Sequence, residues 1–261
     1  MIEISFLGSG SSGNCAVVRC GKTVVLLDAG LSMRETKKRL ALRGVALDEV
    51  RALFLTHEHA DHAHAAWTLS RKLAVPIYAT QGTAAAAGLP GPLFADVRCV
   101  RDGRDSVLAG GDLHVRATRT PHDGTESVCY VFADGAGRRV GVATDLGHLS
   151  AKVAAALRDC EVLGLEANHD VDLLRTGSYP VVLKRRILSD VGHLSNDAAA
   201  TALETLIGPR TGSLAVLHIS KHNNTPALAE RTMASSVRAI GARVRLEVAP
   251  PDCPTPWLGA G

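Results

Sequence analysis

Short apolar segments rich in β-branched residues recur along the whole chain, and segments with helical patterns stand between many of them. The apolar segments predict strands at residues 2–8, 14–20, 23–30, 50–55, 75–80, 113–120, 127–134, 138–145, 161–167, 213–220 and 243–250. Helices are expected at residues 32–43, from the low sixties to Leu73, and at 150–158, 195–207 and 226–240. Strands mixed with helices in this way predict an α/β fold, with two packed sheets and helices on their outer faces.

No low-complexity linker divides the chain, so one domain over residues 1–261 is expected. A hydrophobic fraction of 46% supports an ordinary buried core. Ser32 is expected to cap the helix at 32–43, with Glu35 at the capping-box position. Residues 83–98 contain several glycines and prolines and are expected to be mostly loop. A Pro/Gly tail should follow the last strand.

A GxGxxG pattern at residues 8–13, with Asp28 about twenty residues later, has the form of a dinucleotide-binding loop. Such a site needs a helix that begins at the glycines, so that its amino-terminal end faces a pyrophosphate. The residues that follow alternate like a β-hairpin instead, so a dinucleotide site is not expected. Ser11 and Asn14 of this loop are candidates to line another site, with a plain polar turn as the alternative.

The overall charge is only mildly basic, at +3. Such a charge does not by itself carry nucleic-acid binding, although a local basic groove is compatible with it. The basic run at residues 34–39 is expected to be a solvated helix face. The run at 184–186 is expected either to meet a phosphodiester backbone or to be solvated in the same way.

Six cysteines are scattered along the chain without a CxxC pair. The first residues lack the features of a signal peptide, and no apolar run is long enough to span a membrane. We therefore expect free thiols in a cytoplasmic protein with no membrane partner. The oligomeric state has no sequence signal.

Four residues of the types that bind metals lie close together in THEHADH, directly after the strand at 50–55. His57 and His59 are two positions apart and can project to the same side of an extended chain. Asp61 and His62 would face the same point from the start of the next helix. Four such ligands exceed the need of one tetrahedral ion with an open position, so the motif predicts two divalent ions. Zinc or manganese suits these donors, and iron is a further option.

Three later strand ends carry residues that could complete two metal sites: His122, Asp145 and His218. Each one alone is more often a hydrogen-bonded structural residue. Together, downstream of THEHADH, they are predicted to be ligands, and the Asp145 carboxylate could bridge both ions.

The motifs FLGSGSSGN, LLDAG, THEHADH, TDLGHLS, LEANHD, GHLSN and HISKHNN resemble the metallo-β-lactamase superfamily over essentially the whole chain, and most closely its YycJ/WalJ branch. The resemblance implies an αββα sandwich of two mixed β-sheets with helices on the outer faces and metals at one edge. It also implies 5′→3′ exonuclease or phosphodiesterase activity on DNA.

The resemblance assigns two metal sites and a bridge: His57, His59 and His122 for one ion, Asp61, His62 and His218 for the other, and Asp145 between them. It makes Asp28 a residue that orients the histidine loop. Asn168 and His169 are expected to support the site or face the substrate, with a surface role as the alternative, and Glu166 shares this ambiguity.

His193, in GHLSN, matches a histidine that contacts substrate phosphate in related phosphodiesterases. An imidazole can donate a proton to a leaving alkoxide, so His193 is expected to be catalytic. The alternative is a structural histidine that caps the helix beginning near Ser195. Asp61 is assigned to catalysis as well as to metal binding.

These features predict a binuclear phosphodiesterase, a 5′→3′ exonuclease on single-stranded DNA ends, whose nucleophile is a metal-bridging hydroxide. Hydrolysis of a small cyclic phosphodiester, a thioester or a lactam on the same scaffold is the first alternative. A non-catalytic regulatory protein that binds the metals is the second.

Overall fold

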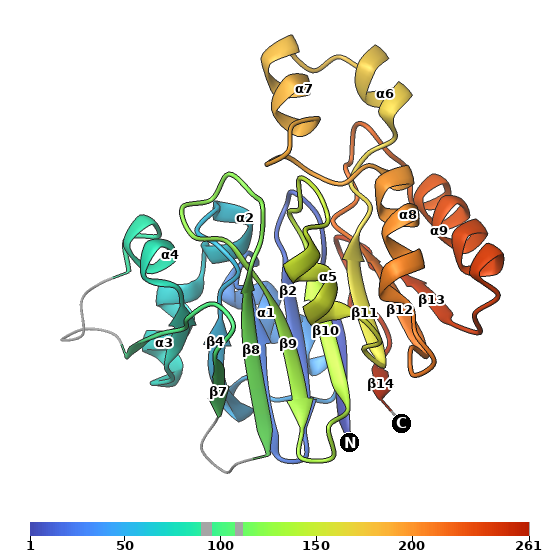
Figure 1. Ribbon diagram of the computed structural model, residues 1–261. Helices are drawn as coiled ribbons and strands as arrows, with labels where there is room; N and C mark the ends of the chain where they lie inside the picture. The colour runs from blue at the N-terminus through green and yellow to red at the C-terminus, as the bar shows by residue number, and fades with distance from the viewer. Residues whose placement is uncertain (90–95, 108–111, 261) are drawn as a thin grey trace.

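The computed structural model describes residues 1–89, 96–107 and 112–260, and within them two seven-stranded sheets lie face to face (Figure 1). The first sheet has the order β14 (Leu258–Ala260), β1 (Ile2–Gly8), β2 (Cys15–Cys20), β3 (Thr23–Leu27), β4 (Val50–Phe54), β5 (Ile77–Ala79) and β6 (Val97–Cys99). The second has the order β13 (Arg245–Val248), β12 (Ser213–Leu217), β11 (Val162–Glu166), β10 (Arg139–Ala143), β9 (Val128–Asp134), β8 (Leu113–Arg119) and β7 (Asp105–Val107).

Both sheets are mixed, as predicted. In the first sheet, β14, β1, β2 and β3 pair antiparallel and β3 to β6 pair parallel. In the second, β7 to β10 pair antiparallel and β10 to β13 pair parallel. Parallel neighbours end at the same edge of a sheet, so the loops after β3 and β4, and those after β10, β11 and β12, can gather their side chains.

Helices cover the outer face of each sheet (Figure 1). The first half contains α1 (Met33–Ala41), the 3₁₀ turn Leu47–Glu49, α2 (Ala60–Ala63), α3 (Ala66–Leu73) and α4 (Gln81–Ala86). The second half contains α5 (Ala151–Leu157), α6 (Val171–Thr176), α7 (Val181–Ile187), α8 (Asn196–Leu206) and α9 (Pro226–Ile240). Leu40 and Leu69 pack α1 and α3 on the first sheet, and Leu203 and Met233 pack α8 and α9 on the second.

The core between the sheets contains an aromatic cluster that also supports the loop after β4. Phe54 packs edge-on against Tyr130 and Phe132, with ring centroids 5.5 and 5.6 Å apart. Each such pair is worth about 0.5–1.5 kcal/mol beyond its buried area. The Tyr130 hydroxyl donates to the Leu55 carbonyl at 2.9 Å, so the second sheet holds the backbone just before THEHADH.

Helix ends follow the local sequence signals. Thr225 accepts from the Leu228 N–H, Pro226 is the first residue of α9, and Gly241 ends it with a left-handed φ of 75°. At α1 the Ser32 hydroxyl accepts from the Glu35 N–H as predicted. The second half of the expected capping box is wrong, because the Glu35 carboxylate accepts from Arg39 Nε at 3.2 Å.

The basic run at 34–39 was expected to be fully solvated, and Arg39 contradicts this. Its side chain is buried, and its guanidinium donates to the carbonyls of Leu7 at 2.9 Å and Pro251 at 2.8 Å. Arg39 is therefore turned toward the interior, where its donors satisfy two backbone carbonyls. Arg34, Lys37 and Lys38 are exposed.

Several short elements depart from the sequence predictions. Within 83–98, α4 extends to Ala86 and β6 begins at Val97, while residues 90–95 lie outside the described part of the chain. The expected Pro/Gly tail contains β14, which pairs with β1. Just before β14, Thr255 accepts hydrogen bonds from the Ser5 hydroxyl and the Phe6 N–H. The helices α6 and α7 were not predicted.

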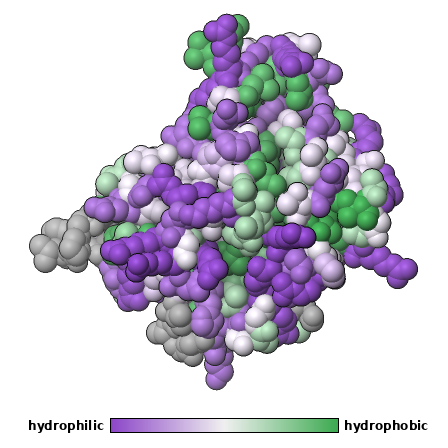
Figure 2. All heavy atoms as spheres, in the orientation of Figure 1, coloured by the Kyte–Doolittle hydropathy of each residue, from purple (hydrophilic) through white to green (hydrophobic). Residues whose placement is uncertain are grey.

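The helices α6 and α7 project beyond the end of the sandwich, at the top of Figure 1. They and the loop after them expose five apolar side chains: Leu173, Val181, Val182, Leu188 and Val191. Figure 2 shows green spheres on this projecting end of the molecule. Among the described residues, no helix has the length and apolar character needed to cross a membrane.

Candidate metal centre

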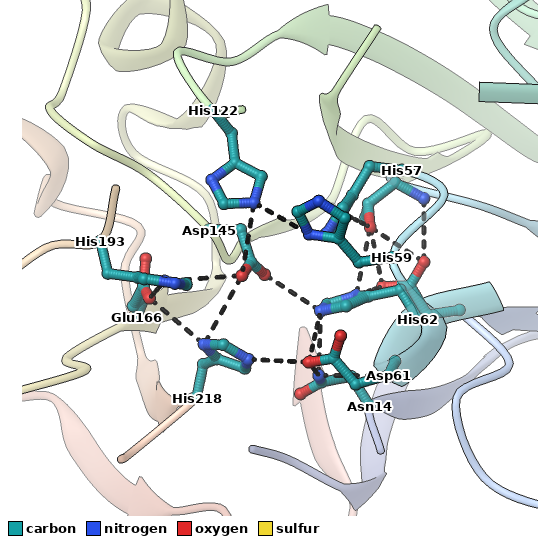
Figure 3. A network of polar contacts seen from close by, with 12 residues as sticks. Asn14, His57, His59, Asp61, His62, His122, Asp145, Glu166, His193 and His218 are labelled. Carbon is teal, nitrogen blue, oxygen red and sulfur yellow. Dashed lines mark hydrogen bonds and ion pairs between the residues drawn. The ribbon is translucent and has the colours of Figure 1, made fainter. Parts of the chain in front are cut away.

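The predicted ligands follow the ends of several strands, and their side chains point toward one another (Figure 3). The loop after β4 supplies His57 and His59, and α2 begins there and carries Asp61 and His62. The loops after β8, β10 and β12 supply the remaining three: His122, Asp145 and His218. Residues far apart in the sequence therefore meet because their strands end together.

The first group of donors consists of three imidazoles. His57 Nε2 lies 3.1 Å from His59 Nδ1, and His122 Nε2 lies 3.4 Å from the same atom. The other nitrogen of two of these rings is engaged elsewhere: His57 Nδ1 lies 3.0 Å from the Thr56 hydroxyl and His122 Nδ1 3.2 Å from the Gly192 carbonyl. The rings therefore turn one nitrogen each toward a common point.

The second group combines a carboxylate with two imidazoles. Asp61 Oδ2 lies 3.4 Å from His218 Nε2 and 3.6 Å from His62 Nε2. The Asn14 amide lies beside both, 3.3 Å from Asp61 Oδ2 and 2.9 Å from His62 Nε2. The predicted role of Asn14 as a supporting residue thus has contacts that fit it.

Asp145 lies between the two groups. Its Oδ2 is 3.1 Å from His62 Nε2, and its Oδ1 is 3.7 Å from His218 Nδ1 and 3.9 Å from His122 Nε2. The side chain is buried, and within the described residues Oδ2 receives no hydrogen bond. A buried carboxylate oxygen without a donor is unfavourable unless a cation satisfies it.

Asp28 fixes the orientation of the His62 ring. Its Oδ2 lies 2.7 Å from His62 Nδ1, and its carboxylate accepts from the Thr56 N–H at 2.8 Å and from the Thr56 hydroxyl at 3.0 Å. Since Nδ1 faces Asp28, Nε2 is the ring nitrogen that is placed to bind a metal. These contacts match the role expected of Asp28.

The backbone of α2 is held against the loops after β1 and β3. The Asn14 N–H donates to the Asp61 carbonyl at 2.7 Å, and the Ala29 N–H donates to the His62 carbonyl at 2.6 Å. Gly30 allows this approach, since a Cβ atom there would lie 1.7 Å from the Asp61 carbonyl oxygen.

Asp28, Asp145 and His218 share a left-handed backbone, with φ values of 58°, 59° and 52°. Each is the residue at which a parallel strand gives way to a loop of the site. This region is sparsely populated by residues other than glycine, and such residues cluster at functional sites.

Glu166, which the sequence left open between site and surface, is fully buried at the end of β11. Its Oε1 lies 2.6 Å from His193 Nδ1 and 3.3 Å from His218 Nδ1, and its Oε2 accepts from the Leu146 N–H at 2.8 Å. The only local signal was a carboxylate at the end of an apolar strand, as Asp28 and Asp145 also show.

The alternative role of His193 as a helix cap does not fit the structure. The N-cap of α8 is Ser195, whose hydroxyl accepts from the Ala198 N–H at 3.1 Å. His193 lies two residues earlier, and with its Nδ1 against Glu166 it keeps Nε2 as its free ring nitrogen.

Two further predicted site residues have different environments. Asn168 Nδ2 donates to the His218 carbonyl at 2.9 Å and lines the cavity beside the centre, where Ser11 also lies. The His169 ring is buried, and none of the described residues hydrogen bonds either of its nitrogens. Burial lowers the pKa of His169 to about 4, so this ring is neutral.

The charges of the buried groups favour a cation. Burial lowers the pKa of His57 well below its usual value and also lowers that of His122, so both rings offer lone pairs. Burial opposes ionisation of Asp145, but the nearby charges of His218 and His62 outweigh it and hold its pKa well below the usual range. Burial likewise opposes the charge of His218, yet Asp145 and Asp61 raise its pKa to about 10.

The donor set fits divalent metals. Imidazole nitrogens that both carry lone pairs repel one another at 3.1–3.4 Å unless a cation or proton lies between them, as at His57, His59 and His122. The groups whose donor atoms all lie within 4.8 Å of one another include His57, His59 and His122, and also Asp61, His62 and His218. Nitrogen and oxygen donors without thiolates suit zinc, manganese or iron.

Beside the centre, Asp123 was missed by the sequence analysis. Its Oδ1 lies 3.3 Å from His122 Nε2 and 3.6 Å from His59 Nε2, and its Oδ2 accepts from Arg186. Arg186 of the second basic run lines the adjoining cavity, whereas Lys184 donates to the Arg175 carbonyl at 2.8 Å. Only the position of Asp123 next to His122 could have suggested its place.

The comparison with protein families identifies a Beta-lactamase superfamily domain over residues 23–219. The chain is 32% identical to Exodeoxyribonuclease YycJ of Bacillus anthracis over 97% of each chain. It is 34% identical to Exodeoxyribonuclease WalJ of Streptococcus pneumoniae, over 97% of this chain and 96% of that one.

Among solved structures, Zn²⁺-bound PqqB from Methylobacterium extorquens superposes with a TM-score of 0.73. The alignment covers 98% of this chain and 99% of PqqB at 17% identity, which shows a shared fold. The predicted αββα sandwich and the predicted resemblance are thereby confirmed. The chain therefore belongs to the metallo-β-lactamase superfamily, in the branch that contains the YycJ and WalJ proteins, and it is a metal-dependent hydrolase.

Proposed function

We propose that this hydrolase holds two divalent ions and cleaves phosphodiester bonds of DNA, removing nucleotides from the 5′ end of single strands. The names of both relatives, exodeoxyribonucleases, support DNA as the substrate. The proposed ligands are His57, His59 and His122 for one ion, Asp61, His62 and His218 for the other, and Asp145 as the bridge. The position of Asp145 between the two groups supports this division.

When bound, the two ions would lower the pKa of a water molecule and neutralise charge on the nonbridging phosphate oxygens. The imidazoles and carboxylates of the site would hold the two ions close together. Asp28 orients His62, and Asn14 contacts Asp61. The Asp61 carboxylate faces the same space and is suited to hold the attacking water by a hydrogen bond. This is the catalytic role that we propose for Asp61.

The observation that carries phosphodiester chemistry is the pair formed by Glu166 and His193. Glu166 holds the proton on Nδ1 at 2.6 Å, and the ring lines the cavity beside the centre. Its Nε2 can then deliver a proton to the leaving 3′-oxygen, which as an alkoxide is a poor leaving group. A thioester leaves as a thiolate and needs no proton donor. Arg186 lines the same cavity, and its cationic side chain suits a phosphate better than the neutral ring of a lactam.

The test is a nuclease assay of the metal-reconstituted protein on labelled single- and double-stranded oligonucleotides with either the 5′ or the 3′ end blocked. We expect mononucleotides from single strands, and protection only by the 5′ block. Bis-p-nitrophenyl phosphate, a thioester and nitrocefin complete the substrate panel. Turnover of the thioester or nitrocefin without any phosphodiester cleavage would reject the proposal.

A further inference from the structure

A cavity of about 160 Å³ opens beside His193, and both apolar and polar side chains line it. Tyr179, which precedes α7, and Leu183 and Ile187 of α7 form an apolar wall. Arg186 of the same helix and Asn168 beside the metal centre contribute polar groups. The cavity therefore joins an apolar wall on the α7 projection to the groups that would perform the chemistry.

Tyr179 differs in its exposure from the other two tyrosines of the chain. Tyr78 and Tyr130 are buried in the core, with 6% and 0% of their surface exposed. Tyr179 is only half-buried. Its ring is flanked by the His222 ring, with centroids 5.7 Å apart, from the loop after β12. A second segment thus braces an aromatic face that borders the cavity.

We propose that this cavity holds the base of the nucleotide on the leaving-group side of the scissile phosphate, stacked on Tyr179 and packed against Leu183 and Ile187. The inference rests on the proposed function. His193 lines the cavity and is the group assigned to protonate the leaving 3′-oxygen. The sugar that carries this oxygen must lie beside His193, and its base is then within reach of the apolar wall.

The chemistry of the wall fits a base better than another ligand. A flat π-face stacks on an aromatic ring whatever the base, so the subsite accepts each of the four nucleotides. Arg186 stands at the same cavity and now pairs with Asp123, so it can turn to a nucleotide phosphate. In 5′→3′ digestion the nucleotide on the leaving-group side is the one released, so the subsite binds the base of the product.

The direct test is calorimetric binding of the product mononucleotides dAMP and dTMP, and of deoxyribose 5-phosphate, to the metal-loaded protein. Stacking of one base predicts that both nucleotides bind about 5- to 150-fold more tightly than the sugar phosphate. Tyr179→Ala should remove this difference, and Tyr179→Phe, which keeps the ring, should retain it. Arg186→Ala should weaken all three ligands by a similar factor, because each carries the phosphate.

Metal content and thermal unfolding of each variant show whether it folds, and Leu183→Ser serves as a second substitution in the same wall. Equal affinity of the wild-type protein for nucleotide and sugar phosphate would overturn the subsite, as would a preference that survives Tyr179→Ala. Oligonucleotides with an abasic 5′ unit separate this outcome from failure of the proposed function. A protein that digests natural and abasic ends equally well is a nuclease without the subsite. One that discriminates the ligands but digests no DNA has the subsite without the proposed function.

Discussion

Glu166 Oε1 lies 2.6 Å from His193 Nδ1, and this contact joins the end of β11 to the loop before α8. The Leu146 N–H holds the other Glu166 oxygen at 2.8 Å, so the carboxylate cannot rotate without losing a hydrogen bond in a buried place. The pair determines both the direction of the His193 ring and the nitrogen that carries its proton.

His193→Ala should retain the metal content of the wild-type protein and the fold but lose roughly 10²–10⁴ in rate, the usual worth of a positioned proton donor. The loss should be greatest when the leaving group is a nucleotide 3′-alkoxide. It should shrink for the p-nitrophenyl ester of thymidine 5′-phosphate, because p-nitrophenolate departs without a proton. The measurement is kcat on a dinucleotide and on this ester.

Glu166→Gln is the companion variant, because it keeps the size of the side chain and removes the charge behind His193. It should show the same dependence on the leaving group in a milder form. Equal losses on both substrates for His193→Ala would assign His193 to phosphate binding, and loss of a metal ion would make it a ligand.

Asp145→Ala should lower the metal content toward one ion per chain or none and abolish turnover, since this carboxylate lies between both donor groups. Elemental analysis after dialysis gives the metal content. Asp102→Ala is a matched control, because that carboxylate is exposed and pairs with Lys152 away from the centre. A variant of Asp145 with two ions and near-wild-type activity would refute the ligand assignment.

Asp28→Asn should weaken metal binding by about 10- to 100-fold, the usual effect of removing a residue that orients a ligand. The amide cannot hold the His62 Nδ1 proton as the carboxylate does at 2.7 Å. Competition with a chromophoric chelator measures the affinity. An unchanged affinity would show that His62 keeps its tautomer without Asp28, or does not bind metal.

Arg186→Ala should weaken the binding of a phosphorothioate single strand and lower the salt dependence of binding by about 0.7 in the log–log slope, as expected for one lost phosphate contact. Fluorescence anisotropy at several salt concentrations measures both. Arg34→Ala, on the exposed face of α1, should change neither quantity. The same slope for both variants would remove Arg186 from the DNA-binding surface.

All six cysteines are free thiols in the structure, and only Cys99 and Cys253 are exposed. Burial raises the pKa of Cys129 to about 12 and that of Cys160 to about 11, so few thiolates form there even at pH 9. Native protein should therefore show two fast-reacting thiols in Ellman's titration between pH 7 and 9, and unfolded, unreduced protein should show six. Fewer than six after unfolding would mean that disulfides form.

The sequence predicted most of the strands because each is a short apolar segment rich in β-branched residues, although it did not predict β6, β7 or β14. It predicted a group of candidate ligands because four of them lie in THEHADH. It did not predict α6 and α7, which are six and seven residues long and bury little, with Leu174 and Ile187 as their buried residues. Short helices with one anchoring side chain carry almost no periodic signal. The role of Glu166 depends on its contact with His193, which lies 27 positions later in the sequence. No local sequence pattern predicts a contact over that distance.

Asp28 and Asp145 both have a left-handed backbone, so the side chain at each position must meet two separate requirements. The turn favours short polar side chains such as aspartate and asparagine, while the centre requires a negative charge. Asparagine keeps the turn and loses the charge, whereas glutamate keeps the charge and fits the turn poorly. Neither of the two usual conservative replacements meets both requirements. We therefore expect no substitution at either of these strand ends to be neutral.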